Sequence, residues 1–240
     1  MSESTDMHLV EAFKNLKLGS ILSLLSGILV IASFFPFLLA MPKMMWWAFH
    51  QEAPRSLREA LTPLMPGILS AAILLLAALI IGIVAIFLWY KASVNFKHYD
   101  EVKFSLGRIG AALALIGSLV LTISLVATLS SVLLSAPQRS PEGGALLVLN
   151  LLPALAGVII GALTYVIGWI LYGVMVMRLS EIPNLSPDFK YAGILMIAGV
   201  VLSILGSFGV VGALVEMASL IMIFVYSDTA IKRLSSAQSH

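Results

Sequence analysis

The chain of 240 residues contains no cysteine, which excludes disulfides, iron–sulfur clusters and thiolate zinc sites. Charged residues are also scarce, at 11%, and the net charge of +2 is too small for a nucleic-acid-binding surface. The chain instead has 60% hydrophobic residues and a mean hydropathy of +1.04. Since a soluble domain is about half apolar and about a quarter charged, this composition predicts a protein whose solvent is the lipid bilayer.

Sequence patterns of catalysis and cofactor binding are missing as well. There is no HExxH, GxSxG, P-loop or GxGxxG motif. The four histidines occupy loops or tails, and none pairs with another at ligand spacing: His8, His50, His98 and His240. A weak metal site at His98 beside two acidic residues is an alternative, but a solvated loop is favoured. We therefore expect no catalytic residue, no metal and no cofactor, and predict that the protein is not an enzyme.

Long uncharged runs divide the chain into membrane-spanning segments, each of which needs about 20 residues. The final run, from Tyr191 to Tyr226, is too long for one helix, and its glycines at 206–212 permit a turn. We therefore predict an all-α, polytopic transmembrane helix bundle forming one domain over 1–240, with no sizeable soluble part. Its six spans are expected at about 18–40, 66–90, 109–135, 146–177, 190–206 and 210–230. The alternative is one long kinked helix at the end.

The distribution of cations predicts the orientation. With six spans, ten of the 14 lysines and arginines fall on one side: Lys14, Lys17, Lys91, Lys97, Lys103, Arg108, Arg178, Lys190, Lys232 and Arg233. The positive-inside rule then places both termini in the cytoplasm, in a multi-pass protein of the cell membrane. Aromatic residues near the ends of the runs, such as Trp89 and Tyr226, are interpreted as interface anchors.

Two segments near the N-terminus need separate interpretation. The first run follows Lys14 and Lys17 as a signal peptide would, but it is too long and lacks a small-x-small cleavage site, so we expect a retained anchor. Loop 41–65 lies on the outer side, where residues 56–62 after Pro54 predict a short interfacial helix. The methionines and His50 of this loop leave a copper(I) site as a less favoured alternative.

Small residues on one helix face predict where membrane helices pack. They recur in three of the spans, as Gly110 and Gly117, as Gly157, Gly161 and Gly168, and as Gly199. We interpret them as packing contacts inside the bundle rather than a dimer interface or a substrate path. The stretches 104–117 and 189–199 each open with phenylalanine and continue with spaced glycines, which indicates either a parallel repeat or a chance likeness.

The stretch Phe104-Ser-Leu-Gly-Arg-Ile-Gly110 and the terminal Tyr226-Ser-Asp-Thr-Ala-Ile-Lys232 resemble an archaeal family of multi-pass membrane proteins, domain of unknown function 973. The resemblance covers most of the chain. It implies a helical membrane fold and an archaeal source, and it brings no activity and no catalytic residues.

Glu216 is the most informative polar residue, because a carboxylate in hydrocarbon is costly and usually faces a bundle interior or a watery cavity. We expect it to form a candidate intramembrane polar site with the hydroxyls of Ser203 and Ser207, and with Ser118 and Thr122 of the third span. It is interpreted either as a proton- or cation-coupling group or, with greater weight, as a structural residue close to the outer interface. Asp228 and Lys232, four residues apart, are expected to form an ordinary helix ion pair.

Three classes of function remain at this point. The favoured one is a non-enzymatic accessory or assembly subunit, or a small membrane binding protein, whose partners are the lipid bilayer and other membrane subunits or a second copy, not nucleic acid. The alternative is a small proton- or cation-coupled transporter or channel that uses Glu216. A membrane-embedded enzyme is disfavoured, because no two polar or metal-binding residues converge at one depth.

Overall fold

The computed structural model describes residues 3–36, 65–135, 141–183, 185–205 and 208–237. These residues form six α-helices and one 3-10 turn, η1 (Leu179–Glu181), and contain no strand. The helices are α1 (Glu3–Ser33), α4 (Met65–Tyr99), α5 (Glu101–Ser135), α6 (Pro141–Arg178), α7 (Phe189–Ile204) and α8 (Gly209–Ala237). The predicted all-α transmembrane helix bundle is confirmed. The predicted interfacial helix at 56–62 lies outside the described residues.

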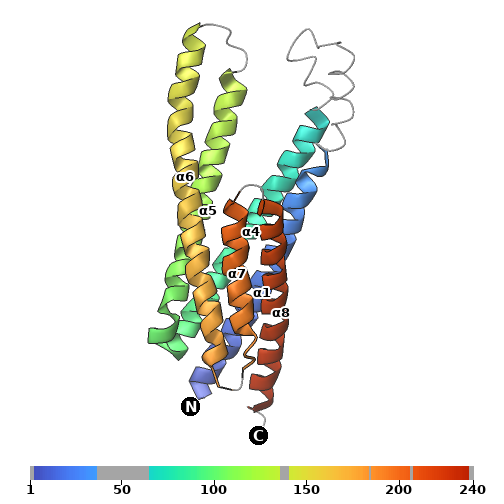
Figure 1. Ribbon diagram of the computed structural model, residues 1–240, viewed down its shortest axis with the longest axis vertical. Coiled ribbons are helices and arrows are strands. Elements are labelled where there is room, and N and C mark those ends of the chain that lie inside the picture. The colour runs from blue at the N-terminus through green and yellow to red at the C-terminus, as the bar shows by residue number, and fades with distance from the viewer. Residues whose placement is uncertain (1–2, 37–64, 136–140, 184, 206–207, 238–240) are drawn as a thin grey trace. The chain divides into compact units, whose positions relative to one another are not determined.

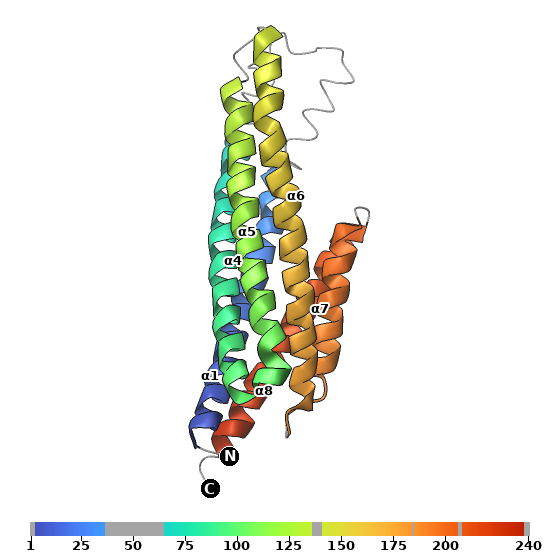
Figure 2. The same ribbon diagram turned by 90° about the vertical axis from the view of Figure 1, so that its left-hand side faces the viewer.

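Of the helices in the described residues, five are long and apolar enough to cross a membrane. Their apolar segments are Met7–Ser33, Leu69–Tyr99, Glu101–Thr128, Leu152–Glu181 and Gly209–Ser236. The remaining helix, α7, has only 16 residues, a rise of about 24 Å. Figure 2 shows it ending well short of the far ends of α5 and α6. The number of helices that cross the whole membrane therefore remains a prediction, and α7 is the shortest of the six predicted spans.

The final apolar run forms two separate helices instead of one long kinked helix. Helix α7 ends at Ile204 and α8 begins at Gly209, so the break falls at the predicted glycine turn. The two helices are antiparallel neighbours, because Gly199 of α7 packs on the backbone of Glu216 while Gly212 of α8 packs on Ser203. Glycine at these positions allows the close return of the chain.

The described residues form two compact units. The smaller one covers residues 22–82, where the Ser26 hydroxyl of α1 donates a hydrogen bond of 2.8 Å to the Ala78 carbonyl of α4. The larger one combines residues 1–21 with residues 83–240 and holds every candidate site residue described below.

Aromatic side chains fill the core of the larger unit. Trp89 of α4 and Tyr172 of α6 have ring centroids 4.8 Å apart, and the Tyr172 hydroxyl donates a hydrogen bond of 3.2 Å to the Trp89 carbonyl. The ring centroid of Phe13 lies 5.0 Å from that of Phe96 and 5.7 Å from that of Phe189. These contacts join α1, α4 and α7. The interpretation of Trp89 as an interface anchor is wrong: its side chain is fully buried because it packs between helices instead of facing lipid.

One end of the larger unit gathers the cations. The start of α1 and the end of α8 lie at this end (Figures 1 and 2). Because consecutive helices are antiparallel, the end of α4, the start of α5, the end of α6 and the start of α7 lie at this end too. An ion pair of 3.3 Å from Lys103 on α5 to Glu181 in η1 joins two of these regions. We call it the basic end, because these helix ends carry the ten cations that the sequence predicts on one side.

Candidate functional site

Glu216 lies on α8, half-buried in the larger unit. A Cβ built on Gly199 of α7 would lie 2.7 Å from the Glu216 nitrogen and 3.0 Å from its Cα, so the two backbones touch. The hydroxyl of Tyr165 on α6 is within electrostatic range of the carboxylate. Among the described residues, Glu216 has no hydrogen bond and no ion pair. The carboxylate is therefore placed between three helices without a charged or hydrogen-bonding partner there.

The hydroxyl of Ser203 does not bond to Glu216. It donates a hydrogen bond of 2.9 Å to the Gly199 carbonyl, one turn back on its own helix. The same oxygen would lie 2.6 Å from a Cβ on Gly212, so Ser203 also forms part of the contact between α7 and α8. Ser207, the other expected partner, lies outside the described residues.

The hydroxyls of α5 bond to their own helix as well. Ser118 donates to the Leu115 carbonyl at 2.8 Å, and Thr122 donates to the Ser118 carbonyl at 2.7 Å. Thr128 and Ser130 do the same further along, to the carbonyls of Ser124 and Val126. The structure does not join Ser118 or Thr122 to Glu216 by a hydrogen bond. Back-bonded hydroxyls satisfy themselves within the helix and leave little polarity for a solute path.

Glycines form the contact between α5 and α6, which run side by side in both views (Figures 1 and 2). A Cβ on Gly117 would lie 2.8 Å from the Gly161 carbonyl oxygen, and a Cβ on Gly110 would lie 2.7 Å from that of Gly168. Gly157 lies against Ser124, whose Cβ would be 3.2 Å from an added one. Real side chains do not come this close, so the backbones meet here because the residues are glycine.

The same kind of contact continues to α7 and α8. A Cβ on Gly193 of α7 would lie 2.6 Å from the Gly173 carbonyl oxygen of α6, and one on Gly212 of α8 would lie 2.7 Å from that of Gly199. Sequence analysis singled out Gly199 as a packing residue but did not assign this role to Gly173, Gly193 or Gly212. Four consecutive helices are thus joined through backbone contacts at glycine.

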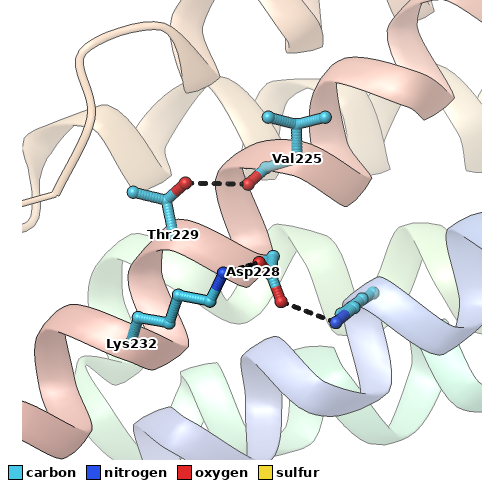
Figure 3. A network of polar contacts seen from close by, with 5 residues as sticks. Val225, Asp228, Thr229 and Lys232 are labelled. Carbon is cyan, nitrogen blue, oxygen red and sulfur yellow. Dashed lines mark hydrogen bonds and ion pairs between the residues drawn. The ribbon is translucent and has the colours of Figure 1, made fainter.

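Asp228, in the second half of α8, forms two ion pairs through its carboxylate (Figure 3). Lys232, four residues on, lies 2.7 Å from one carboxylate oxygen, as the spacing indicates. Lys17 of α1 lies 2.6 Å from the other oxygen, and its ammonium nitrogen is 5.3 Å from the centroid of the Phe224 ring. Sequence spacing could not show the second pair, because its partners stand 211 residues apart.

A hollow of about 310 Å³ lies at the basic end, where α4 passes into α5. Five side chains line it: Val94, Lys97, His98, Glu101 and Arg108. The ring of His98 also lies 5.4 Å from that of His8 on α1, a neighbour that the sequence spacing missed. Within the part of the chain that the structure describes, no three His, Cys, Asp or Glu side chains gather as metal ligands do. The copper alternative in loop 41–65 falls outside that part.

Comparison with known proteins gives one match. A family model described as protein of unknown function (DUF973) matches residues 10–240. No curated protein and no solved structure matches the chain.

Proposed function

This chain belongs to the DUF973 family, and from that premise we propose that it is a non-enzymatic accessory or assembly subunit of a membrane complex. The observation that carries the proposal is the glycine contact that joins α5, α6, α7 and α8 backbone to backbone. Helices in such close contact leave no room for a solute or a substrate between them at these positions. The hydroxyls of α5, which are turned to their own carbonyls, support the same conclusion.

The outer face of the bundle supports a binding role. Large apolar side chains point outward along the helices, among them Ile123 and Val210, which are 67% and 76% exposed. In the membrane such a surface meets lipid or the helices of another subunit.

The proposed setting is the cell membrane, with both termini in the cytoplasm. The support is the convergence of the cation-bearing helix ends at the basic end of the larger unit. Lysine and arginine collect on the cytoplasmic side of membrane proteins. The six-span topology predicted from the sequence is kept in this proposal.

Purification from the native membrane tests the accessory role. The tagged protein is extracted in mild detergent, and the particle is weighed by native mass spectrometry. We expect a mass that includes a second polypeptide in a fixed ratio, which dissociates in harsh detergent. A particle of this chain alone after gentle extraction contradicts an accessory role.

The alternative, a small proton- or cation-coupled transporter or channel, is favoured by one observation: the half-buried carboxylate of Glu216 has no hydrogen bond or ion pair among the described residues. A pH-sensitive dye in proteoliposomes separates the two functions. The accessory proposal predicts equal proton flux for wild type, Glu216→Gln and protein-free vesicles. A flux that wild type and Glu101→Gln share and that Glu216→Gln abolishes would establish the transporter instead.

A further inference from the structure

Within the described part of the chain, the hollow at the basic end contains an arginine that forms no hydrogen bond or ion pair, and it lies where the helices enter the membrane. Lys97 is already paired with Glu101, at 2.7 Å from nitrogen to oxygen. Arg108 lines the same hollow, is exposed, and has no hydrogen bond or ion pair among the described residues, although its charge also acts on the Glu101 carboxylate. The hollow therefore offers an unpaired guanidinium, whose fork of N–H donors fits the oxygens of a phosphate.

The position of Arg108 sets the depth of the hollow. It is the last charged residue of α5, because residues 109–135 carry no charge. Val94 lines the hollow on the α4 side, one turn from Lys91, and α4 carries no charge on the N-terminal side of Lys91. The hollow thus lies where the polar helix ends meet the apolar span, which is the depth of lipid phosphates.

Apolar side chains continue from the hollow along both helices. Phe87 precedes Val94 by seven residues on α4 and is 46% exposed, with the Lys91 ammonium nitrogen 5.1 Å from its ring centroid. Leu115 follows Arg108 by seven residues on α5 and is half-buried. Residues seven apart lie on one helix face, so both stand above the hollow on the side facing the bilayer. A lipid with a phosphate headgroup and acyl chains matches this arrangement, in which a cation is followed along the helices by an apolar surface.

We propose that the hollow between α4 and α5 binds the phosphate of an anionic lipid headgroup, with Arg108 as the principal contact and His98 and Lys97 beside it. Basic pockets between membrane helices on the side of positive charge are known to suit such headgroups. The acyl chains lie over Phe87 and Leu115. Val94 closes the apolar side of the headgroup site.

Native mass spectrometry of the purified full chain, titrated with dioctanoyl phosphatidic acid in detergent, tests this site. Wild type is expected to bind one lipid saturably, and Arg108→Gln is expected to weaken binding by about tenfold or more, since hydrogen bonds to charged groups contribute about 1.5–3 kcal/mol. The matched control is Lys190→Gln, an exposed cation at the basic end outside the hollow, which should bind as wild type does. Equal binding by wild type and Arg108→Gln would overturn the proposal.

Two further arms keep the result decisive. Dioctanoyl phosphatidylcholine, which is neutral overall, should bind wild type more weakly than phosphatidic acid. Inorganic phosphate should compete only at far higher concentration than the lipid; competition at equal concentration would assign the hollow to free phosphate and overturn the lipid. If Arg108→Gln does not fold, Arg108→Lys replaces it, and it should bind more weakly than wild type because it lacks the guanidinium fork.

Discussion

The ammonium nitrogen of Lys17 lies 2.6 Å from a carboxylate oxygen of Asp228 and so joins the first helix of the chain to the last. Both side chains are about one-third exposed, at 29% and 32%, whereas Lys232 on the other carboxylate oxygen is 75% exposed. Water weakens an exposed pair more than a sheltered one. The long-range pair therefore contributes more to the fold than the local one.

Loss of the Lys17 ammonium should destabilise the protein measurably. We expect Lys17→Gln to lower the melting temperature in detergent by about 2–4 °C and Lys232→Gln to lower it less. Lys14→Gln, an exposed lysine one turn away, is the control and should leave it unchanged. The exchange variant, which combines Lys17→Asp with Asp228→Lys, should have a higher melting temperature than either substitution alone. A melting temperature no higher than that of the single variants would argue against the pair.

A methyl group at Gly117 should separate α5 from α6. Alanine normally stabilises a helix interior by up to about 1 kcal/mol relative to glycine, but overpacking costs about 1–3 kcal/mol. Because the added Cβ would meet the Gly161 carbonyl oxygen at 2.8 Å, we expect Gly117→Ala to lower the unfolding free energy. Gly209→Ala is the control, since its nearest atom would be 3.7 Å away. Equal thermal stability of Gly117→Ala and wild type would contradict the backbone contact.

The hydroxyl of Tyr172 is expected to stabilise the contact between α4 and α6. Tyr172→Phe keeps the ring against Trp89 but removes the buried hydrogen bond to the Trp89 carbonyl, which should cost about 0.5–1.5 kcal/mol of unfolding free energy. Denaturant titration followed by tryptophan fluorescence measures it. The control Tyr191→Phe, at a residue that is 60% exposed, should leave the unfolding free energy unchanged. Equal effects of the two variants would show that the Tyr172 hydrogen bond does not stabilise the fold.

Replacement of Glu216 should stabilise the protein if the residue is structural and unpaired. A carboxylate inside the membrane is costly, and this one has no partner among the described residues. We expect Glu216→Leu to raise the melting temperature by about 2–4 °C and Glu216→Gln to raise it less. A fall of several degrees in both variants would show that the carboxylate makes a stabilising interaction.

Local patterns in the sequence predicted which segments form helices. They did not predict that α1 begins at Glu3 or that α4 continues to Tyr99, so the placement of His8 in a tail and His98 in a loop is wrong: both lie in helices. An uncharged run becomes a helix because hydrocarbon offers no partner for its backbone N–H and C=O groups, and the rise per residue sets the length that spans the bilayer. The glycines after Leu205 correctly predicted where the last run breaks.

Contacts between distant residues could not be read in this way. The Lys17–Asp228 pair, the nearness of His8 to His98 and the burial of Trp89 all depend on which helices become neighbours.

The candidate polar site shows the same limit. The sequence identified Glu216 as unusual, since a charge in an apolar run is visible locally. It could not show that Ser203, Ser118 and Thr122 bond to their own helices, because a hydroxyl on a helix face fits either a neighbouring carboxylate or the carbonyl one turn back.

Single-cysteine labelling tests the central claim, a multi-pass membrane protein with both ends in the cytoplasm. The natural chain has no cysteine, so each introduced thiol is the only one. Met7→Cys, Ser56→Cys and Ser235→Cys are exposed to a membrane-impermeant maleimide in intact cells and after permeabilisation. We predict that Ser56→Cys is labelled in intact cells and that the other two are labelled only after permeabilisation. Labelling of Ser235→Cys in intact cells would place the C-terminus outside and contradict the account.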